Sequence, residues 1–270
     1  MNADRSLREL MSLKGRVALV TGGAGHIGRS IGHALAELGA DIAVIDISSS
    51  GSADAAAELS RQWKVAAAGF DCDLEQAEVV RDLPRRVRER FGRIDIIVNC
   101  AAFVGTSGLE GWAVPFEQQA DATWRRALEV NLTAPFVLVQ AAAGDLRASG
   151  HGSIINISSI YGLAGPDWRL YEGTDLGNPA AYAASKGGLI QATRWLATTL
   201  APQVRVNAIA PGGVFRDTPE PFLGRYVART PLGRMAREED FKGAVAYLAS
   251  DLSAYVTGQC LTVDGGWTVW

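Results

Sequence analysis

The feature that most constrains this chain is a regular alternation of short apolar runs with longer helix-like stretches over most of its 270 residues. Apolar runs without a polar alternation are typical of strands buried on both faces of a parallel sheet. The runs cover residues 16–21, 41–45, 65–70, 94–98, 153–157, 204–209 and 261–263. The helix-like stretches between them cover residues 26–38, 54–62, 75–91, 121–148, 180–200 and 238–249. The pattern predicts an α/β fold, a doubly wound sheet of about seven parallel strands with helices on both faces.

The chain shows no linker, composition break or internal repeat, so residues 1–270 are predicted to form a single domain. Three segments fall outside the alternation, at residues 103–120, 163–179 and 211–231. Each follows a predicted strand and therefore belongs at the carboxyl edge of the sheet, where open α/β sheets bind ligands. Long loops in a compact domain are commonly functional, so we expect these three to be substrate loops.

Composition and charge exclude several classes of function. A net charge of −3 and a pI near 5.7 give no electrostatic footprint for nucleic acid, and the basic run 81–93 is interrupted by Asp82 and Glu89. The three cysteines are widely spaced and form no metal-ligand pattern with the three histidines, so we expect no metal and a reducing compartment. Apolar runs of strand length predict no membrane span. Residues 1–16 lack the apolar core of a secretory signal, and a cytoplasmic location is expected.

A glycine-rich motif, TGGAGHIG at residues 21–28, stands between the first predicted strand and the first predicted helix. Glycines let the backbone approach a pyrophosphate whose charge meets the N–H groups of a helix N-terminus, although a plain tight turn is the alternative. Asp46 ends the second strand, 24 residues beyond Gly22, where a carboxylate would bind the ribose hydroxyls of a dinucleotide. That carboxylate would repel a 2′-phosphate, which favours NAD over NADP. The alternative for Asp46 is a cap or turn residue.

A second candidate for the nucleotide site is DCDL at residues 71–74, after the third predicted strand. Asp73 could accept a hydrogen bond from the exocyclic amine of an adenine, or it could cap the next helix. The spacing alone does not choose between these two interpretations.

A tyrosine and a lysine, Tyr182 and Lys186, stand four residues apart on one face of a predicted helix. A nearby cation lowers the pKa of a tyrosine, and such a tyrosine can take a proton from an alcohol while hydride leaves the same carbon. An exposed pair without a function is the alternative. Two further features support the catalytic interpretation, because Ser158 and Ser159 end the fifth strand and the polar Asn131 interrupts an apolar helix.

Taken together, these motifs resemble the short-chain dehydrogenase/reductase family of compact type, from residue 13 to residue 266. The resemblance is carried by TGGAGHIG, CDL at 72–74, NCAA at 99–102, the Asn131 motif, ISS at 157–159, YAASK at 182–186 and AIAPGG at 208–213. It implies a Rossmann-type fold and a homotetramer, or a dimer. It implies that Tyr182 is the general acid/base and that Ser159 orients the substrate oxygen. Lys186 would lower the pKa of the tyrosine and hold the nicotinamide ribose, and Asn131 would sustain a water chain to solvent.

The resemblance also implies a set of contacts to the cofactor. These are Gly22, Ile27, Gly28, Asp46, Asp73, Leu74, Asn99, Ala101, Tyr182, Lys186, Pro211 and Val214. Gly25 and His26 of the glycine motif are predicted to join them: His26 could donate to a phosphate, or it could face solvent at the start of the helix.

The sequence departs from the family pattern in three places. His26 stands where compact members carry a glycine, so the glycine spacing is closer to that of the nucleotide-sugar-epimerising branch. That branch has a longer C-terminal substrate domain than this chain contains. Ser159 and Tyr182 are 23 residues apart, about ten more than is usual in the family, and Arg216 replaces a frequent threonine.

The substrate loops carry aromatic and charged side chains, and four of them are predicted to face the substrate: Trp112, Trp168, Arg169 and Arg216. Aromatic faces with arginines suit a hydroxyl-rich or anionic substrate better than a steroid or an acyl chain. Closing a lid or packing between subunits is the alternative for these side chains. Parts of the chain are similar to family members associated with surface-polysaccharide and flagellin-sugar biosynthesis, which points to a sugar or nucleotide-sugar alcohol.

The predicted function is an NAD-dependent oxidoreductase that interconverts a secondary alcohol and a ketone. Two alternatives remain open from the sequence. The first is an enzyme that acts on a non-sugar carbonyl metabolite. The second is an NAD-binding sensor without turnover, against which the Asn131, Ser159, Tyr182 and Lys186 set argues.

Overall fold

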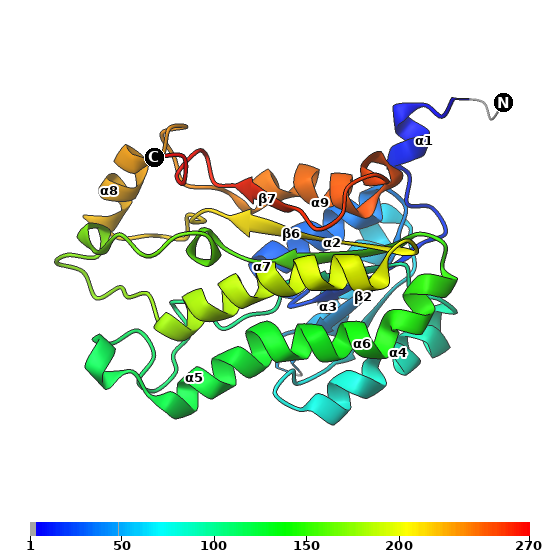
Figure 1. The fold of residues 1–270 in the computed structure, drawn as a ribbon. Helices are drawn as coiled ribbons and strands as arrows, with labels where there is room; N and C mark the ends of the chain where they lie inside the picture. The colour runs from blue at the N-terminus through cyan, green and yellow to red at the C-terminus, as the bar shows by residue number, and fades with distance from the viewer. Residues whose placement is uncertain (1–3, 48) are drawn as a thin grey trace.

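A computed structural model describes residues 4–47 and 49–270 of the chain, so the first three residues of the N-terminal segment discussed above lie outside it. Its centre is a sheet of seven strands that pair in parallel, in the order β3-β2-β1-β4-β5-β6-β7 (Figure 1). The strands are β1 (Val17–Thr21), β2 (Asp41–Asp46), β3 (Ala67–Asp71), β4 (Ile96–Asn99), β5 (Gly152–Ile157), β6 (Val204–Pro211) and β7 (Cys260–Val263). The predicted doubly wound, Rossmann-type sheet of about seven parallel strands is confirmed.

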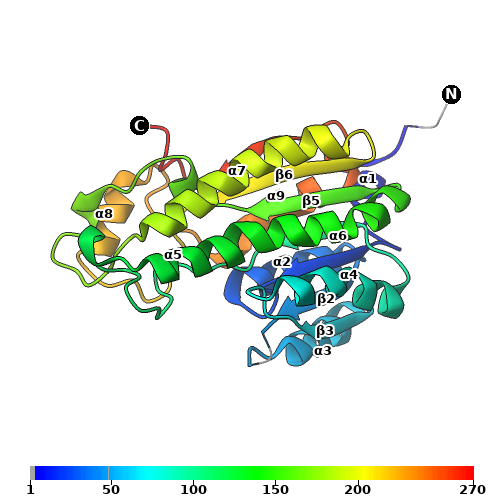
Figure 2. The same cartoon turned by 60° about the horizontal axis from the view of Figure 1, so that its bottom comes forward.

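The helices form a layer on each face of the sheet (Figure 2). One layer holds α2 (His26–Glu37), α3 (Ser52–Trp63) and α9 (Lys242–Ala249), whose buried side chains share one core cluster. The other holds α4 (Ala77–Phe91), α6 (Ala134–Ala148) and α7 (Ala180–Leu200), which share a second cluster. The remaining helices are α1 (Leu7–Met11), α5 (Asp121–Leu128) and α8 (Phe222–Arg229).

The strands bury both of their faces, as their continuous apolar sequences require. In β1, Val17 and Leu19 pack into one core cluster while Ala18 and Val20 pack into the other. This period of two follows from the pleat of a strand, which points successive side chains to opposite faces. The carboxyl ends of all seven strands therefore meet one edge, and the segments that follow them lie together there.

The stretch Asp121–Ala148 corrects the expectation that no apolar segment is long enough to cross a membrane. It is 28 residues long, and its length and composition meet the requirement for a span, but half of its most apolar window is buried inside the molecule. It consists of α5, a π-helical turn at Glu129–Thr133, and α6, which packs against α4. Pro135 is the second residue of α6 and directly follows the π-helical turn, so it lies where the regular α-helical hydrogen bonding of Asp121–Ala148 is interrupted.

The predicted loops 163–179 and 211–231 contain more structure than expected. The second of them includes α8, whose buried Phe222 and Tyr226 belong to a small core cluster separate from the two main ones. That cluster also contains Leu170 of the first loop and Trp267 near the C-terminus. Figure 1 shows α8 and the C-terminus beside one another, beyond the carboxyl end of β6. The loops 163–179 and 211–231 and the C-terminal segment thus pack against one another at the carboxyl edge of the sheet.

Candidate active site

A cavity of about 1280 Å³ opens at the carboxyl ends of the strands. Its wall includes Asp46 and Asp73 from β2 and the loop after β3, and Ser159, Tyr182 and Lys186 from the β5–α7 region. Pockets for small ligands commonly measure about 300–1,000 Å³, so this cavity has room for a dinucleotide and a second small molecule.

Most of the residues predicted from sequence lie in the wall of this cavity. The predicted residues in the wall are Gly22, Gly25, His26, Ile27, Gly28, Asp46, Asp73, Leu74, Ala101, Ser159, Tyr182, Lys186, Pro211, Val214 and Arg216. The predicted residues outside the wall are Asn99, Asn131, Trp112, Trp168 and Arg169.

The glycine motif folds so tightly that a side chain has no room at Gly22 or Gly28. Gly22 has a φ of +64°, and a Cβ added there would lie 2.8 Å from the Cα of Ala101. A Cβ at Gly28 would lie 2.0 Å from the carbonyl oxygen of Gly22. The first turn of α2 follows with Gly25 at its N-cap, and no side chain there satisfies the free N–H groups. A backbone cradle with free N–H donors in the cavity wall fits the pyrophosphate of a dinucleotide.

Asp46 is held at the rim of this cradle by backbone donors. Its Oδ2 accepts a hydrogen bond from the N–H of Ala24 at 3.0 Å, and its Oδ1 accepts one from the N–H of Ile47 at 2.9 Å. The carboxylate therefore fixes the glycine motif and also lines the cavity, so its local structural role and the predicted ribose contact are compatible.

Asp73 does not cap the next helix, because α4 has Gln76 at its N-cap and no side-chain cap, and its carboxylate instead fixes the turn before that helix. Its Oδ1 accepts from the N–H of Glu75 at 3.0 Å, and its Oδ2 accepts from Nε2 of Gln76 at 2.9 Å. Asp73 also lies in the cavity wall, so a contact to an adenine remains compatible with these hydrogen bonds.

Asn99 lies beneath the cavity and not in its wall. Its Nδ2 donates to Oδ1 of Asn156 at 2.8 Å, and Nδ2 of Asn156 donates to Oγ1 of Thr193 at 2.8 Å. The two asparagines are paired in the β4–β5 register. This buried polar chain joins β4, β5 and α7 under the site, and sequence analysis did not single out Asn156 or Thr193.

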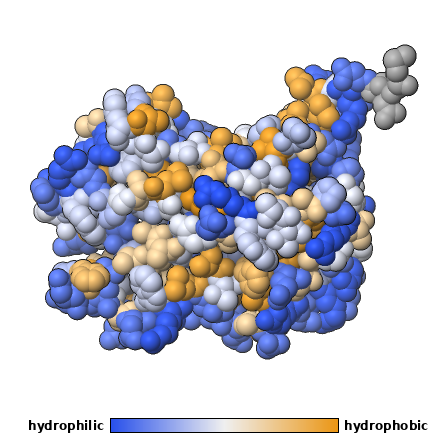
Figure 3. Space-filling view, viewed as in Figure 1, coloured by the Kyte–Doolittle hydropathy of each residue, from blue (hydrophilic) through white to orange (hydrophobic). Residues whose placement is uncertain are grey.

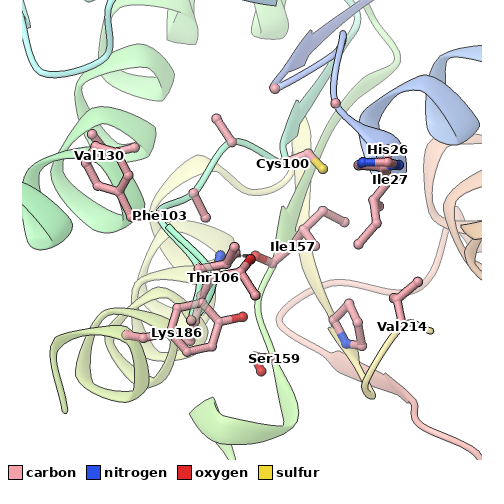
Figure 4. A pocket seen from close by; sticks show the side chains of 18 of the residues that line it. His26, Ile27, Cys100, Phe103, Thr106, Val130, Ile157, Ser159, Lys186 and Val214 are labelled. Atoms are coloured by element: carbon pink, nitrogen blue, oxygen red, sulfur yellow. Dashed lines mark hydrogen bonds between the residues drawn. The ribbon is translucent and has the colours of Figure 1, made fainter. Parts of the chain in front are cut away.

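Tyr182 and Lys186 lie one turn apart on α7, as the sequence predicted. The Lys186 Nζ lies 5.8 Å from the centre of the Tyr182 ring and donates to the carbonyl oxygen of Ile157 at 2.7 Å. Figure 4 shows Lys186 and Ser159 on neighbouring walls of the same pocket, with Ile157 above them. The geometry brings a hydroxyl, a phenol and an amine together at the end of β5.

The surroundings of these groups change their acidity. Burial raises the pKa of Tyr182, and a hydrogen bond with Ser159 opposes that rise. Burial lowers the pKa of the Lys186 ammonium to about 8. The predicted lowering of the tyrosine pKa by Lys186 is therefore not seen: the pKa of Tyr182 lies above its ordinary value, and Lys186 directs its Nζ to the Ile157 carbonyl.

Asn131 occupies the π-helical turn between α5 and α6 and is 1% exposed. Its Oδ1 accepts from the N–H of Phe103 at 2.8 Å, and its Nδ2 donates to the Phe103 carbonyl and to Oγ of Ser185, each at 3.1 Å. Ser185 Oγ in turn donates to the carbonyl of Tyr182 at 2.8 Å. Asn131 thus ties the loop after β4 to the start of α7, and its part in a water chain stays a prediction.

Three of the four predicted substrate contacts do not face the cavity. Trp112 is 2% exposed, and its Nε1 donates to the Val104 carbonyl at 2.7 Å, so it supports the 103–120 loop from within. Trp168 packs against Tyr171 with ring centres 5.5 Å apart and is 57% exposed. The exposed Arg169 forms an ion pair with Asp167 at 2.7 Å. The three predictions were wrong for the same reason. The sequence indicates that a loop lies at an edge of the sheet, but it does not indicate the direction in which each side chain of the loop points.

Arg216 does line the cavity, and its Nε forms an ion pair with Glu238 at 3.2 Å. Tyr161 and Asn178, in the substrate wall, were not predicted from the sequence. The two missed residues flank the catalytic motifs, two residues after Ser159 and four before Tyr182, and that adjacency was the available signal.

Comparisons with known proteins agree with this geometry. A family model described as "Enoyl-(Acyl carrier protein) reductase" matches residues 22–268. The chain is 35% identical over 260 residues to the cis-4-hydroxycyclohexanecarboxylate dehydrogenase of Sinomonas cyclohexanicum, covering 94% of this chain and 96% of the relative. The chain belongs to the short-chain dehydrogenase/reductase family.

Two solved structures of the same fold are similar to this short-chain dehydrogenase/reductase. One is a gluconate 5-dehydrogenase from Burkholderia cenocepacia in complex with NADP and tartrate, with a TM-score of 0.87, 30% identity, and coverage of 98% of this chain and 100% of that one. The other is an NAD⁺-bound xylitol dehydrogenase, with a TM-score of 0.82, 30% identity, and coverage of 94% and 99%.

The short-chain dehydrogenase/reductase described here is therefore an oxidoreductase that interconverts an alcohol and a ketone, and its cofactor class is a nicotinamide dinucleotide. The comparisons give no support for the narrower resemblance to enzymes of surface-polysaccharide or flagellin-sugar biosynthesis.

Proposed function

We propose that this protein is an NAD-dependent dehydrogenase of a small, hydroxyl-rich secondary alcohol, with Tyr182 as the general acid/base. The observation that carries the proposal is a single cavity that joins the glycine motif and Asp46 at one end to Ser159, Tyr182 and Lys186 at the other. This arrangement lets a dinucleotide and an alcohol meet beside a titratable phenol.

A nicotinamide dinucleotide, when bound, supplies the hydride acceptor. The residues of the chain bind it, orient the substrate and move the proton. Gly22 and Gly28 let the backbone close into the tight cradle that would hold the pyrophosphate, and the Ser159 hydroxyl would orient the substrate oxygen. In oxidation, Tyr182 would take the hydroxyl proton of the alcohol, and a nicotinamide dinucleotide held in the cradle would accept the hydride from the carbinol carbon, so that the alcohol becomes a ketone. Lys186 would hold the nicotinamide ribose, and its Nζ, a cation below a pH of about 8, lies 5.8 Å from the centre of the Tyr182 ring.

The preference for NAD rests on Asp46. Its carboxylate stands at the rim of the cradle, fixed by two backbone N–H groups, and would meet a 2′-phosphate with a like charge. The hydroxyl-rich substrate class is supported by the names of the similar structures, a gluconate 5-dehydrogenase and a xylitol dehydrogenase.

We extend the proposal to a single domain over residues 1–270 and to a cytoplasmic homotetramer. Exposed apolar side chains support an assembly: Trp124, Phe136 and Trp195 lie on α5, α6 and α7 and are 39%, 40% and 57% exposed. Apolar patches alternate with polar ones over the face of the molecule shown in Figure 3. Light scattering tests the assembly, and a monomeric mass would refute it.

The test of the function is NADH formation from NAD with a panel of free sugars, polyols, sugar phosphates, nucleotide sugars, simple secondary alcohols and a steroid. Wild type is expected to turn over polyols or sugars, and Tyr182→Phe is expected to lose about 10²–10⁴-fold in kcat while keeping its affinity for NADH. Tyr255→Phe, at a fully exposed tyrosine, serves as the matched control and should behave as wild type. Tight NADH binding with no turnover on any alcohol would sink the proposal in favour of a sensor.

A further inference from the structure

Three polar side chains form a group in the cavity wall that the proposed reaction does not use. They are Tyr161, Tyr171 and Asn178, called the hydroxyl cluster here. The hydroxyls of Tyr161 and Tyr171 are hydrogen-bonded to each other at 2.7 Å. Asn178 is 7% exposed, and its Oδ1 has no hydrogen-bond partner among residues 4–47 and 49–270.

The hydroxyl cluster is fixed next to the reacting groups by the backbone. The N–H of Tyr161 donates to Oγ of Ser159 at 3.1 Å. On the other side, the N–H of Tyr182 donates to the carbonyl of Pro179, the residue after Asn178, at 3.0 Å. A group bound by the cluster therefore lies close to an oxygen held by Ser159 and Tyr182.

The two tyrosine rings are held by aromatic packing. Tyr171 meets Phe222 edge to face with ring centres 5.2 Å apart, and Phe222 stacks on Tyr226 at 5.9 Å. Tyr161 meets Trp267 edge to face at 6.1 Å. The rings stay in place when a hydroxyl is removed, because these contacts involve only the aromatic faces and edges.

The hydroxyls of the cluster remain protonated and can donate. Burial is the main cause that raises the pKa of both Tyr161 and Tyr171, and the nearby Asn178 carboxamide only partly opposes this. In the Tyr161–Tyr171 hydrogen bond one hydrogen is shared, which leaves the hydrogen of the other hydroxyl for another acceptor. The oxygen of the Asn178 carboxamide has no partner among the described residues and can accept a hydrogen bond from a ligand.

The charges near the cluster favour a neutral ligand. Asp175, in the same insertion, lines the cavity as a carboxylate that repels anions. Lys186 uses its Nζ on the Ile157 carbonyl, and Arg126 and Arg216 in the wall are paired with Glu75 and Glu238. A phosphate or carboxylate beside the cluster would thus find a like charge and no unpaired cation among the described residues of the wall.

We propose that the hydroxyl cluster binds a second, non-reacting hydroxyl of the substrate, and that the substrate is a neutral diol or polyol with that hydroxyl beside the reacting carbinol. This inference rests on the proposed dehydrogenase function and names the substrate class of the same site. A hydroxyl both donates and accepts, which matches a wall of two phenols and one carboxamide. A site built to hydrogen-bond a hydroxyl discriminates strongly against an analogue that lacks it, because its polar groups are then left unpaired.

The experiment compares 1,2-cyclohexanediol with cyclohexanol, which share a ring and differ by one hydroxyl. In wild type, kcat/KM is expected to be at least about tenfold higher for the diol. Tyr171→Phe and Asn178→Leu should remove most of that preference by lowering the value for the diol while leaving cyclohexanol within about twofold. Tyr255→Phe is the matched control for loss of a phenolic hydroxyl outside the cavity. Equal losses for both alcohols, or no loss for the diol, would overturn the inference.

A binding measurement separates this inference from the proposed reaction. In the Tyr182→Phe background with NADH bound, calorimetry gives the affinity for each alcohol without turnover. The diol is expected to bind more tightly than cyclohexanol, and adding Tyr171→Phe should abolish the difference. If wild type turns over neither alcohol but this binding difference holds, the dehydrogenase proposal fails and the hydroxyl cluster stands. Equal binding of both alcohols contradicts the cluster whether or not wild type shows turnover.

Discussion

The nucleotide side of the cavity and its substrate side are built in different ways. On the nucleotide side, backbone meets backbone: Gly22, Gly28 and Ala101 approach so closely that Cβ atoms are excluded from the glycines. These contacts follow from the register of β1 with its neighbours, which sets Thr21 beside Ile45 and Asn99. On the substrate side the wall rests on side chains that are distant in sequence, such as Tyr161, Phe222 and Trp267.

The difference shows which parts of a site can be predicted from a motif. A backbone cradle needs particular residue types at particular spacings, so its sequence is distinctive. A wall of packed side chains can be made by many combinations, and its geometry is set by what each segment meets in three dimensions. The following predictions test how far this contrast extends.

The largest effect is expected for Gly28→Ala. The added Cβ would lie 2.0 Å from the Gly22 carbonyl oxygen, so the cradle must open or the chain must fail to fold. We expect loss of NADH binding by more than about 100-fold, together with a lower unfolding midpoint. The matched control is Gly165→Ala in the substrate loop, where a Cβ would meet nothing within 4 Å. Similar NADH affinities for the two variants would remove the contrast between the two sides.

The second largest effect is expected for Lys186→Met, at a residue of the cavity wall between the nucleotide side and the substrate side, and it concerns the pH dependence of stability. Its folded pKa of about 8 is below the value of 10.5 that applies to the unfolded chain, so the unfolded state binds more protons between these values. Stability contributed by this group therefore rises with pH from about 8 to about 10.5 and is constant below pH 8. Denaturant unfolding of the cofactor-free protein should show wild type gaining up to roughly 3 kcal/mol relative to Lys186→Met across that window. A parallel pH dependence in the two proteins would contradict the buried ammonium, and Lys14→Met at an exposed lysine is the control.

A smaller effect is expected for Asp46→Asn, which removes the charge but keeps an acceptor for the Ala24 N–H. Without the carboxylate, repulsion of a 2′-phosphate falls. We expect the ratio of NADPH to NADH affinity to rise about tenfold, equivalent to about 1.4 kcal/mol. Fluorescence titration with both reduced cofactors measures this, and an unchanged ratio would refute the role of Asp46 in cofactor choice.

The smallest effect is expected for Arg169→Ala. The side chain is 77% exposed, pairs with Asp167 and lies outside the cavity wall, so kcat/KM for every alcohol should stay within about twofold of wild type. Arg216→Ala is the informative comparison, because Arg216 lines the cavity. A substrate-specific loss in the Arg169 variant would show that the 163–179 loop moves over the site.

Sequence analysis recovered the fold more completely than the substrate wall. The strand and helix pattern predicted the seven-stranded sheet, and the glycine motif, Asp46, Ser159 and the Tyr182–Lys186 pair all reach one cavity. It failed for Trp112 and Arg169, since an aromatic or charged residue in a loop can point inward to the loop, outward to solvent or into the cavity. It also missed α8, because the short helix depends on burying Phe222 and Tyr226 against Trp267.

The sequence by itself determined the parallel sheet, the position of the cradle and the tyrosine–lysine pair, because each depends on local rules: strand burial, backbone sterics and the helical repeat. Only the tertiary structure decided that Tyr161, Tyr171 and Asn178 share a wall, and that Asn131 and Asn99 lie beneath the cavity. It also decided that Arg169 faces solvent. These outcomes depend on contacts between segments far apart in the chain, and the close packing of side chains at those contacts fixes the direction in which each one points.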